Sequence, residues 1–552
     1  MPIAWGGPKD GLARLILIAF HHRSRRTTVI DLGALMKWKS AKRKEKELRV
    51  EGWRALPEAS QPIAAQALAD LELRIQGKIV LPNDPEYHSA RQLSNFAFQD
   101  FPQLIAYCEI VADVRQCLKY ARAKKLPVVV RSGGHCTAGF SISSGMVIDV
   151  SRLSYVVVDA AKKQAIVGAG TRFGRLFHEL DIYNLHVPGG GCHDVCVAGF
   201  MQGGGFGYTS RKFGMNCDNV VEALVLLADG GIVTASTTTN PDLFWALRGG
   251  TGGNFGILLQ VTYQLHDLGP LWGFRYTWQI QTDDGKTQAA RLLALLQSGY
   301  MAKGAPPELG YQAFLGWQLD KPCLVVRGMF AGTADEGRAL LEPLRAIKEP
   351  ETNDRIGSYL DMDVFIHEKP DIPQVDDLAR EDKQSGYIAK PLDANDWRRV
   401  IDKFLTTPNP WSLVGIEAYG GAINAQPEDA TAFVHRKVSL DLYLDVFWMT
   451  DEERGPAVNF LDEFMGFMEK EYFTGASYQN YPRLTQTDYR RRYWGCHFER
   501  LLGIKRKYDP DTFFSYPQGV LPEPQLATVM TAAANAKTAA PYDPIVYVLP
   551  PE

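Results

Sequence analysis

The chain has 552 residues, of which 45% are hydrophobic and 22% charged, and its formal net charge is −3. These values are ordinary for a globular protein and exclude a mainly disordered, collagen-like or coiled-coil chain. The near balance of 60 basic and 63 acidic residues gives no electrostatic reason to expect binding to nucleic acid. Eight cysteines without a CxxC pair are too few for a disulfide scaffold and do not indicate a zinc ribbon.

The N-terminal segment carries no convincing targeting or membrane signal. Its apolar run at 15–20 is far shorter than the roughly 20 residues that a bilayer-spanning helix needs. Basic residues at 21–26 follow this run, whereas those of a signal peptide precede the apolar stretch. We therefore expect residues 1–85 to form an extension that is partly helical, over 54–75, and we favour a cytoplasmic protein with no transmembrane segment.

The first half of the chain alternates short helices with buried strands. Apolar periodicity predicts these elements in chain order: a helix at 109–125 and strands at 128–130, 146–150, 166–170 and 220–227. Thr171 is expected to cap a helix that runs through Leu180, because a threonine hydroxyl can accept from the first free amides. The sequence Asp229-Gly230-Gly231 predicts a hairpin turn after the last of these strands.

After residue 268 the glycine clusters stop, and strands alternate with amphipathic helices. The clearest strand lies at 438–448, where apolar and polar residues alternate. We expect an antiparallel strand with its apolar face packed and its polar face open. A similar alternation at 412–419 predicts another strand, and the Pro- and Ala-rich tail from about 522 is expected to lie over the surface.

Three glycine clusters stand out, at 132–135, 188–207 and 249–256. We interpret each as a loop at the end of a strand, where backbone amides can approach a phosphate closely. Three such loops indicate a large, elongated, phosphate-bearing ligand. The chain has no GxGxxG, P-loop or HExxH motif, which excludes the standard dinucleotide-binding and metalloprotease interpretations.

Two reactive side chains lie inside these loops, His135 in the first and Cys192 in the second. An imidazole and a thiol can each attach a cofactor covalently, although hydrogen bonding by His135 and packing by Cys192 are the ordinary structural alternatives. Cys192, His193 and Cys196 lack a fourth ligand at the usual spacing, so we expect no metal site there.

Together, four glycine-containing motifs resemble the flavin-binding domain of the vanillyl-alcohol oxidase superfamily. They are Arg131-Ser132-Gly133-Gly134-His135, the segment 189–195, the run 203–207 and the glycine motifs within 248–256. In the C-terminal part, Tyr478-Gln479-Asn480-Tyr481 and the motifs that follow it are similar to the signature of the berberine bridge enzyme-like branch. The resemblance covers roughly residues 90–520.

The resemblance implies an α+β protein, with a two-subdomain PCMH-type FAD-binding domain and a substrate domain whose antiparallel sheet is covered by helices. The sheet of the substrate domain is expected to cover one side of the flavin ring. The expected boundaries are 86–268 for the first part of the FAD-binding domain, 269–470 for the substrate-binding domain, 471–522 for the C-terminal return of the FAD-binding domain and 523–552 for a surface tail.

The same resemblance implies FAD held by two covalent bonds, from His135 to a flavin methyl group and from Cys192 to a ring carbon. The chain departs from the family pattern at Cys196, where glycine is common, at Phe200, where histidine is common, and at Cys136, which leaves a spare thiol near the flavin. The other residues that match cofactor-binding positions are Arg131, Ser132, Gly133, Gly134, Gly191, Val195, Gly199, Gly204, Gly205, Gly207, Asn254, Gly256, Tyr478 and Asn480.

For catalysis, Tyr481 matches the position that acts as the base in several family members. Because tyrosine has a pKa near 10, it needs nearby positive charge or hydrogen bonds to act at neutral pH. Glu417 matches a position where relatives place a side chain that points at the substrate, with a solvated strand residue as the alternative interpretation. Tyr443 is expected to contribute from the polar face of the strand at 438–448.

The implied reaction is oxidation of an alcohol or sugar hydroxyl by hydride transfer to the flavin, with O2 reduced to H2O2. Val195 favours an oxidase, because valine at the matching family position goes with oxygen reactivity and a bulkier residue with its loss. The alternatives are a secondary-metabolite tailoring oxidase that forms C–C or C=C bonds, a dehydrogenase with another electron acceptor, and a flavin-retaining protein without turnover. The expected partners are a small-molecule substrate and O2.

Four tryptophans offer surfaces on which a sugar or aromatic substrate could stack, but core packing is the favoured role for each. They are Trp272, Trp278, Trp317 and Trp411.

Overall fold

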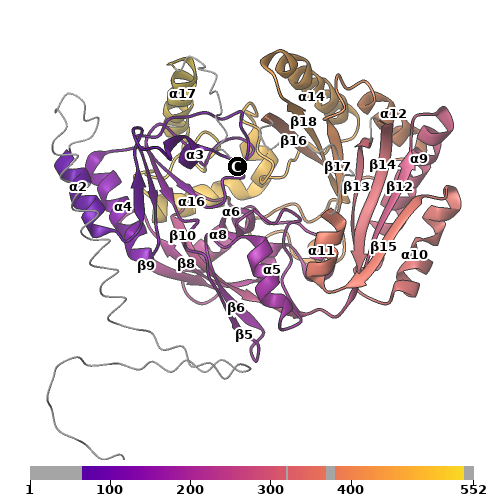
Figure 1. The fold of residues 1–552 in the computed structure, drawn as a ribbon, viewed down its shortest axis with the longest axis horizontal. Coiled ribbons are helices and arrows are strands. Elements are labelled where there is room, and N and C mark those ends of the chain that lie inside the picture. The colour runs from indigo at the N-terminus through magenta and orange to yellow at the C-terminus, as the bar shows by residue number, and fades with distance from the viewer. Residues whose placement is uncertain (1–64, 319–320, 368–379, 540–552) are drawn as a thin grey trace, which may run out of the picture. The chain divides into compact units, whose positions relative to one another are not determined.

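The computed structural model describes residues 65–318, 321–367 and 380–539. The chain divides into two compact units, Met1–Gln76 and Gly77–Glu552. In the first unit, the described residues form helix α2 (Ala65–Arg74), within the range where a helix was expected. The remainder of that expected helix, at 54–64, lies outside the described residues. All sheets of the described residues belong to the second unit (Figure 1).

A four-stranded sheet opens the second unit. Its order is β1-β2-β4-β3, with β2, β4 and β3 parallel and β1 antiparallel at one edge. Helix α4 (Val111–Lys124) makes the crossover from β2 to β3, because parallel strands cannot be joined by a tight turn. The strands are β1 (Lys78–Val80), β2 (Leu104–Tyr107), β3 (Val128–Arg131) and β4 (Met146–Asp149).

A five-stranded antiparallel sheet follows, with the order β5-β6-β10-β8-β9. The strands are β5 (Val156–Asp159), β6 (Gln164–Gly168), β8 (Val220–Leu226), β9 (Ile232–Ser236) and β10 (Ile257–Gln264). The predicted hairpin joins β8 to β9, where Leu226 pairs with Ile232. Gly230 has φ +88° in this turn, a left-handed conformation that glycine adopts without steric cost.

The prediction that Thr171 caps the next helix is wrong. Helix α5 (Phe173–Asp181) begins after Arg172, whose side chain makes no capping hydrogen bond. The Thr171 hydroxyl instead donates to Tyr155 O at 3.1 Å and accepts from Tyr155 N at 3.2 Å. It therefore ties two neighbouring loops together rather than covering the free amides of the helix.

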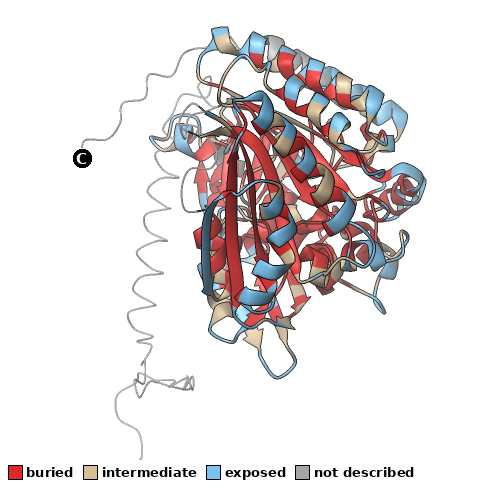
Figure 2. Ribbon diagram, turned by 90° about the vertical axis from the view of Figure 1, so that its right-hand side faces the viewer, coloured by how far each residue is buried: buried red, intermediate tan, exposed pale blue. Residues whose placement is uncertain are grey.

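A seven-stranded antiparallel sheet forms the second half of the unit, with the order β15-β12-β14-β13-β17-β18-β16. Its strands are β12 (Leu271–Gln279), β13 (Leu309–Gln318), β14 (Lys321–Phe330), β15 (Glu351–Gly357), β16 (Arg380–Ile388), β17 (Leu413–Ala418) and β18 (Leu440–Trp448). The helices that cover one face are α9 (Asp283–Leu295), α10 (Ala334–Ile347), α12 (Ala394–Phe404) and α14 (Asp451–Glu471). In Figure 2 the buried strands lie behind helices whose outward side is exposed. The predicted α+β class, with an antiparallel sheet covered by helices, is confirmed.

A large apolar core lies between this sheet and its helices. Leucines of β18 pack there with side chains of α12 and α14. Trp272 and Trp278 belong to this core and Trp317 packs against it, so the predicted packing role of these three tryptophans is confirmed. Trp411 is half-buried outside this core.

The strand expected at 438–448 is β18, but its polar face is not open. Asp441, Tyr443 and Asp445 are 0%, 8% and 4% exposed. The physical reason is that β18 turns this face away from the helices and toward an internal cavity, which Tyr443 lines. Alternation of polarity along a strand separates two faces, but it does not tell which kind of environment covers the polar one.

The C-terminal segment returns to the first half of the unit. Gln479 Nε2 and Trp494 Nε1 both donate to Gly249 O, each at 3.1 Å. Lys505, on α16 (Phe498–Tyr508), is fully buried and donates to Asn254 O at 2.5 Å. The expected surface tail contains a helix, α17 (Glu523–Ala539), which its Pro- and Ala-rich composition did not predict.

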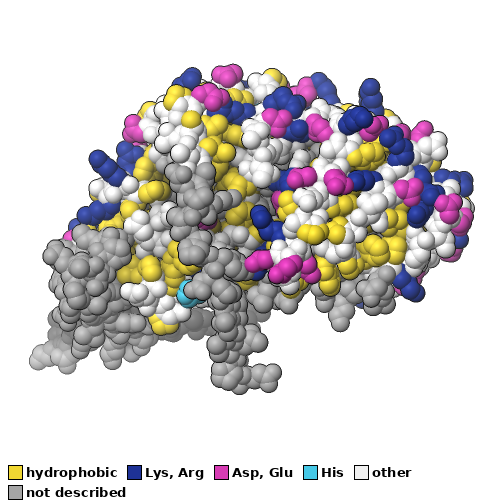
Figure 3. Space-filling model, turned by 90° about the horizontal axis from the view of Figure 1, so that it is seen from above, with side chains coloured by type: hydrophobic (Ala, Val, Ile, Leu, Met, Phe, Trp, Pro, Cys, Tyr) yellow, Lys and Arg dark blue, Asp and Glu magenta, His cyan; other side chains and the backbone are white. Residues whose placement is uncertain are grey.

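The surface carries a mixture of charges. Figure 3 shows Lys and Arg side chains interspersed with Asp and Glu over the face seen there, in keeping with the small net charge. Among the described residues, no helix is both long enough and apolar enough to cross a membrane.

Candidate active site

An internal cavity of about 1050 Å³ lies between the glycine loops and the polar face of the seven-stranded sheet. Its walls come from all three glycine clusters, from strands β13, β14, β16, β17 and β18, and from the C-terminal segment 478–482. Small-molecule sites typically measure roughly 300–1,000 Å³. The cavity therefore has room for a large ligand such as a dinucleotide together with part of a substrate.

The first two glycine loops touch each other at Gly133. A Cβ at this position would lie 3.1 Å from Cys196 N and 3.2 Å from Cys196 Sγ, so a side chain there would press on the second loop. The first loop follows β3, and the second follows the short strand β7 (Leu185–His186), as predicted. The third, at 249–256, follows helix α8 (Pro241–Leu247), so the prediction that it ends a strand is wrong.

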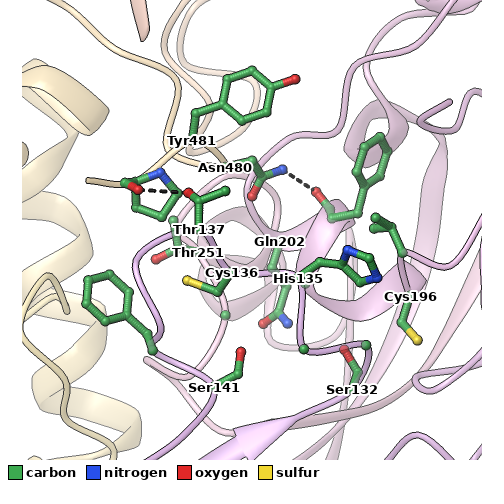
Figure 4. A pocket seen from close by; sticks show the side chains of 18 of the residues that line it. Ser132, His135, Cys136, Thr137, Ser141, Cys196, Gln202, Thr251, Asn480 and Tyr481 are labelled. Carbon is green, nitrogen blue, oxygen red and sulfur yellow. Dashed lines mark hydrogen bonds between the residues drawn. The ribbon is translucent and has the colours of Figure 1, made fainter. Parts of the chain in front are cut away.

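His135 and Cys192, the two candidate attachment residues, both line the cavity. Burial lowers the pKa of the His135 imidazole, which favours the neutral ring. Cys192 is exposed, but desolvation by the surrounding protein atoms raises the pKa of its thiol. Figure 4 shows Tyr481 on the upper side of the pocket and His135 and Cys196 on the lower side. The two reactive side chains therefore share one chamber with the C-terminal tyrosine.

Most of the predicted cofactor-binding residues line this cavity. They are Ser132, Gly133, Gly134, His135, Gly191, Cys192, Val195, Gly199, Gly256, Tyr478 and Asn480. Arg131, Gly204, Gly205, Gly207 and Asn254 do not line it and instead support the loops behind it. For example, Arg131 pairs with buried Asp149 at 2.6 Å, and Gly205 N donates to Tyr478 Oη at 2.9 Å.

The predicted catalytic side chains Glu417, Tyr443 and Tyr481 all line the cavity. Tyr481 Oη donates to Glu417 Oε1 at 2.7 Å, and Gln312 Nε2 donates to the same oxygen at 3.1 Å. Tyr208 Oη in turn donates to Gln312 Oε1 at 2.8 Å, which orients the amide. Glu417 is 2% exposed, so its alternative interpretation as a solvated strand residue is wrong.

The protonation states of this hydrogen-bonded pair follow from its burial. Burial raises the pKa of Glu417 to about 7, against the opposing Tyr481 hydrogen bond and Lys383 charge. Burial and the Glu417 charge raise the pKa of Tyr481 well above its usual value. Tyr481 is therefore a protonated donor in this site, while Glu417 can gain or lose a proton near neutral pH.

Lys383 is a cavity residue that sequence reasoning missed. Strand β16 reads as a charged surface strand, yet Lys383 Nζ lies 4.8 Å and 4.9 Å from the ring centroids of Tyr443 and Tyr481. It also pairs with Asp445 Oδ2 at 2.5 Å. A positive charge of the kind that a tyrosine base was expected to need therefore lies near Tyr481, but the pKa of Tyr481 is still raised well above its usual value by burial and by the Glu417 charge. No local sequence signal identified Lys383, because the polar face of the neighbouring strand, which carries Asp445, was expected to be open.

The register of the sheet aligns four polar residues across four strands. Arg327 pairs with Gln312, Gln312 with Glu417, and Glu417 with Asp441. Because directly paired residues lie on the same face of a sheet, the four form one row on the cavity side. Burial and the Glu417 charge raise the pKa of Asp441 well above its usual value, so Asp441 is the neutral end of the row.

Gly415 makes room for Tyr443 in the neighbouring row. The two residues are cross-strand partners in β17 and β18. A Cβ at Gly415 would lie 2.1 Å from Tyr443 Cζ, so the phenol ring occupies the space that a side chain would need. The missing side chain lets the ring lie flat over β17 instead of being displaced toward the ligand space.

A second titratable cluster lies in the wall behind Gly191. His193 Nε2 contacts Asp363 Oδ2, and His367 Nδ1 donates to Asp363 O at 2.6 Å. Possible ligand atoms of the three residues lie within 4.8 Å of one another, an arrangement that would suit a divalent metal. Burial and the Arg327 charge lower the pKa of His367 to about 4, and the same charge opposes a cation here.

Comparison with known proteins agrees with this architecture. Residues 102–236 match the family model described as an FAD binding domain, and residues 477–521 match the one described as berberine and berberine like. The FAD-linked oxidoreductase YgaK of Bacillus subtilis is 27% identical over 470 residues, which cover 81% of this chain and 98% of YgaK. The chain carries the FAD-binding domain and the C-terminal domain that characterise berberine bridge enzyme-like proteins. It is an FAD-linked oxidoreductase with the PCMH-type fold.

Solved structures with the same fold superimpose on most of the chain. BBE-like 1 of Physcomitrella patens has a TM-score of 0.74 at 25% identity, covering 83% of this chain and 98% of its own. A chitooligosaccharide oxidase has a TM-score of 0.73 at 22% identity, covering 83% and 99%, a likeness of fold alone.

The residues of the berberine bridge enzyme-like site fit FAD. Glycines at 133, 134, 190, 191, 199, 252 and 253 line the cavity, so the backbone can approach the cofactor at many points. Gly134 and Gly253 have φ +73°, a conformation that turns successive amides toward a bound anion. The cavity then continues to the row that contains Glu417, which leaves the polar face of the sheet for the substrate.

Proposed function

We propose that this FAD-linked oxidoreductase oxidises an alcohol or sugar hydroxyl by hydride transfer and that O2 accepts the electrons, forming H2O2. The observation that carries the proposal is the Tyr481–Glu417 hydrogen bond, inside the same cavity as His135 and Cys192. Bound FAD supplies the hydride acceptor. The chain itself supplies the proton acceptor, the orientation of the substrate and the exclusion of water.

The substrate proton passes to the Tyr481–Glu417 pair. Because Tyr481 is protonated, it accepts a proton only as it donates its own to Glu417. Glu417, with a pKa of about 7, is a suitable final acceptor at neutral pH. Gln312 holds Glu417 Oε1 in place through the 3.1 Å hydrogen bond, and Tyr443 flanks Tyr481 with its ring centroid 5.0 Å away.

FAD is attached through both His135 and Cys192 in this proposal. The support is that both side chains line one cavity and that their loops are in contact at Gly133 and Cys196. A neutral imidazole, favoured at His135 by its lowered pKa, is the nucleophilic form of histidine. Cys196 does not compete for this role, because its thiol is buried and donates to Gly170 O at 3.3 Å.

Val195 supports O2 as the electron acceptor. It lines the cavity three residues after Cys192, in the loop expected to lie beside the flavin. In a close-packed wall, a single additional methylene group changes whether a small molecule fits. A valine side chain at this position obstructs oxygen less than a leucine side chain would, because leucine would fill more of the space next to the flavin.

The purified holoprotein is screened with alcohols, sugars and aromatic alcohols in two assays. Without oxygen, bleaching of the flavin absorbance is measured; with oxygen, the formation of H2O2 is measured. Bleaching with a carbonyl product, followed by one H2O2 for each product molecule, is the expected result. Reoxidation by a quinone or dye but not by O2 would identify a dehydrogenase. A C–C or C=C product without a carbonyl would identify a tailoring oxidase, and absence of bleaching by every compound would reject hydroxyl oxidation.

A further inference from the structure

Arg327 is a buried cation in the wall of the substrate space. It belongs to β14, is 8% exposed and lines the cavity. Its guanidinium lies 4.5 Å from the Phe314 ring centroid, and Nη1 donates to Ile366 O at 3.2 Å. Its Nε has no hydrogen-bond partner. A buried guanidinium with an unused donor is costly unless a ligand satisfies it.

No carboxylate of the described residues neutralises Arg327 within the 4.0 Å that defines an ion pair. Of the Lys and Arg residues, only Arg327 and Lys383 line the described cavity, and they differ in this respect. Lys383 has Asp445 at 2.5 Å, so its charge is balanced inside the protein. Within the described part of the chain, the charge of Arg327 has no carboxylate to balance it.

The nearby carboxyl groups of Asp363 and Glu417 each have one oxygen in a hydrogen bond to another residue: Asp363 Oδ2 contacts His193, and Glu417 Oε1 accepts from Tyr481 and Gln312. Their second oxygens, Asp363 Oδ1 and Glu417 Oε2, have no hydrogen-bond partner, but neither forms an ion pair with Arg327. Burial raises the pKa of the Tyr208 hydroxyl, and the charge of Arg327 acts in the opposite direction. Tyr208 is a neutral partner, however, so it does not balance the charge of Arg327. Arg327 therefore keeps its net charge while being withdrawn from bulk solvent.

The register of the sheet sets how far the backbone of Arg327 lies from that of Glu417. Arg327, Gln312 and Glu417 are successive cross-strand partners, so two strand spacings separate the backbone positions of Arg327 and Glu417. With neighbouring strands about 4.8 Å apart, the two backbone positions are about 10 Å apart on one face. That span suits a molecule the size of a sugar or a substituted aromatic ring, with a reacting group at one end and an anion at the other.

We propose that Arg327 binds a carboxylate of the substrate, so that the substrate class is a hydroxylated carboxylic acid. This inference rests on the proposed hydroxyl oxidation at the Tyr481–Glu417 end of the same cavity. A guanidinium binds a carboxylate through two parallel hydrogen bonds, which fixes the direction of the molecule as well as its position. The carboxylate holds one end at Arg327, and the hydroxyl to be oxidised is then directed toward Tyr481 and Glu417.

Binding to the holoprotein is measured by calorimetry and by perturbation of the flavin absorbance, without requiring turnover. The probes are matched pairs that differ in a carboxylate: glucuronate with glucose, and 4-(hydroxymethyl)benzoate with 4-methylbenzyl alcohol. Benzoate serves as a carboxylate that has no hydroxyl to oxidise. In the parent protein, each acid is expected to bind about 10- to 100-fold more tightly than its neutral partner.

Two variants of Arg327 complete the test. Arg327→Met should remove the preference for the acids, Arg327→Lys should keep part of it, and both should retain the flavin content of the parent. Equal binding of acid and neutral partners by the parent protein would overturn the proposal. Loss of flavin in Arg327→Met would also overturn it, because it would show that Arg327 binds the cofactor instead of the substrate. If the acids bind but no probe is oxidised, the carboxylate site at Arg327 is supported and only the proposed hydroxyl oxidation is rejected.

Discussion

The hydroxyl of Tyr481 donates a 2.7 Å hydrogen bond to Glu417 Oε1, although 64 positions of sequence separate the two residues. Tyr481 comes from the C-terminal segment and Glu417 from the middle of the seven-stranded sheet. The pKa of the tyrosine is raised well above its usual value and that of the carboxyl is raised to about 7. In the proposed reaction the pair acts as one proton-accepting unit, in which Glu417 holds the proton.

The rate of flavin reduction should depend on the ionisation of Glu417. Because the base must be ionised, and its pKa is raised to about 7, the rate should be low below that pH, rise through it and level off above it. Glu417→Gln removes the titrating group, so the rate should fall by about 10²–10⁴-fold and this inflection should disappear. Anaerobic stopped-flow measurements across the neutral range check both effects. Asp441→Asn, the matched amide change in the next strand, should leave the rate within a few-fold of that of the parent. If the inflection persists in Glu417→Gln, Glu417 is not its source.

Tyr481→Phe keeps the ring and removes the hydroxyl that bridges the substrate and Glu417. Folding and flavin content should survive because the change is nearly isosteric, while flavin reduction should slow by about 10²–10⁴-fold. Tyr443→Phe is the matched control, since no hydrogen bond links Tyr443 to Glu417 among those of the described residues. Equal losses in the two variants would show that the proton does not pass specifically through Tyr481.

Covalent attachment is tested by single and double variants of the two loop residues. Acid-precipitated protein should keep its flavin in Cys192→Ala, through His135, and in His135→Ala, through Cys192. The double variant should release all of its flavin. Absorbance of the washed precipitate measures retention, with Cys196→Ala as a thiol control that should behave as the parent. Release of all flavin from the parent protein would reject both bonds.

Val195→Leu should slow reoxidation by O2 without changing reduction by substrate. The added methylene group occupies space in the cavity wall beside Cys192, and the expected slowing is about tenfold or more. The holoprotein is reduced without oxygen, mixed with aerated buffer and followed by flavin absorbance. Val197→Leu, a matched change at a buried position outside the cavity, serves as the control. Unchanged reoxidation in Val195→Leu would mean that oxygen reaches the flavin by another route.

Lys383→Met should affect both stability and the pH profile. It leaves buried Asp445 without its cation, which should lower the free energy of unfolding by about 3–5 kcal/mol. It also removes a charge that lowers the pKa of Glu417, so the inflection in flavin reduction should move to higher pH. Denaturant unfolding and stopped-flow kinetics measure the two effects.

The companion variant separates these two consequences. Lys383→Met combined with Asp445→Asn should recover much of the stability, because no buried charge is left unpaired, while the inflection stays displaced. Lys437→Met, which breaks an exposed ion pair with Glu428, should change the unfolding free energy by no more than about 1 kcal/mol. An unmoved inflection in Lys383→Met would show that Lys383 does not tune Glu417.

The glycine loops were accessible to sequence reasoning because their information is local. Each reactive residue lies within a contiguous motif, so His135 and Cys192 were identified before any pairing of strands was known. The same holds for Tyr481, which belongs to a four-residue motif. The hairpin at Asp229-Gly230-Gly231 was predicted for the same reason, since a turn depends on the conformations of a few adjacent residues.

The charged residues of the substrate wall were not accessible in this way. Lys383, Arg327 and Gln312 lie on three different strands, and they share one wall only through the order and register of the seven-stranded sheet. In isolation, a lysine or arginine in a strand of mixed polarity looks like a surface residue. The cluster of His193, Asp363 and His367 was missed because His193 comes from the second glycine loop, whereas Asp363 and His367 lie one turn apart on helix α11 (Tyr359–His367).

By itself, the sequence determined the glycine loops and the motifs that carry the family resemblance, and this resemblance implied the α+β class and FAD, because motif spacing is a property of neighbouring residues. Only the tertiary structure decided that the polar face of β18 is enclosed, that Glu417 receives hydrogen bonds from Tyr481 and Gln312, and that Arg327 forms no ion pair with a carboxylate of the described residues. The physical reason is that alternation along a strand separates its two faces without saying what covers them. Burial, which raises the pKa of Glu417 and isolates the charge of Arg327, arises only when the distant halves of this unit close around the cavity.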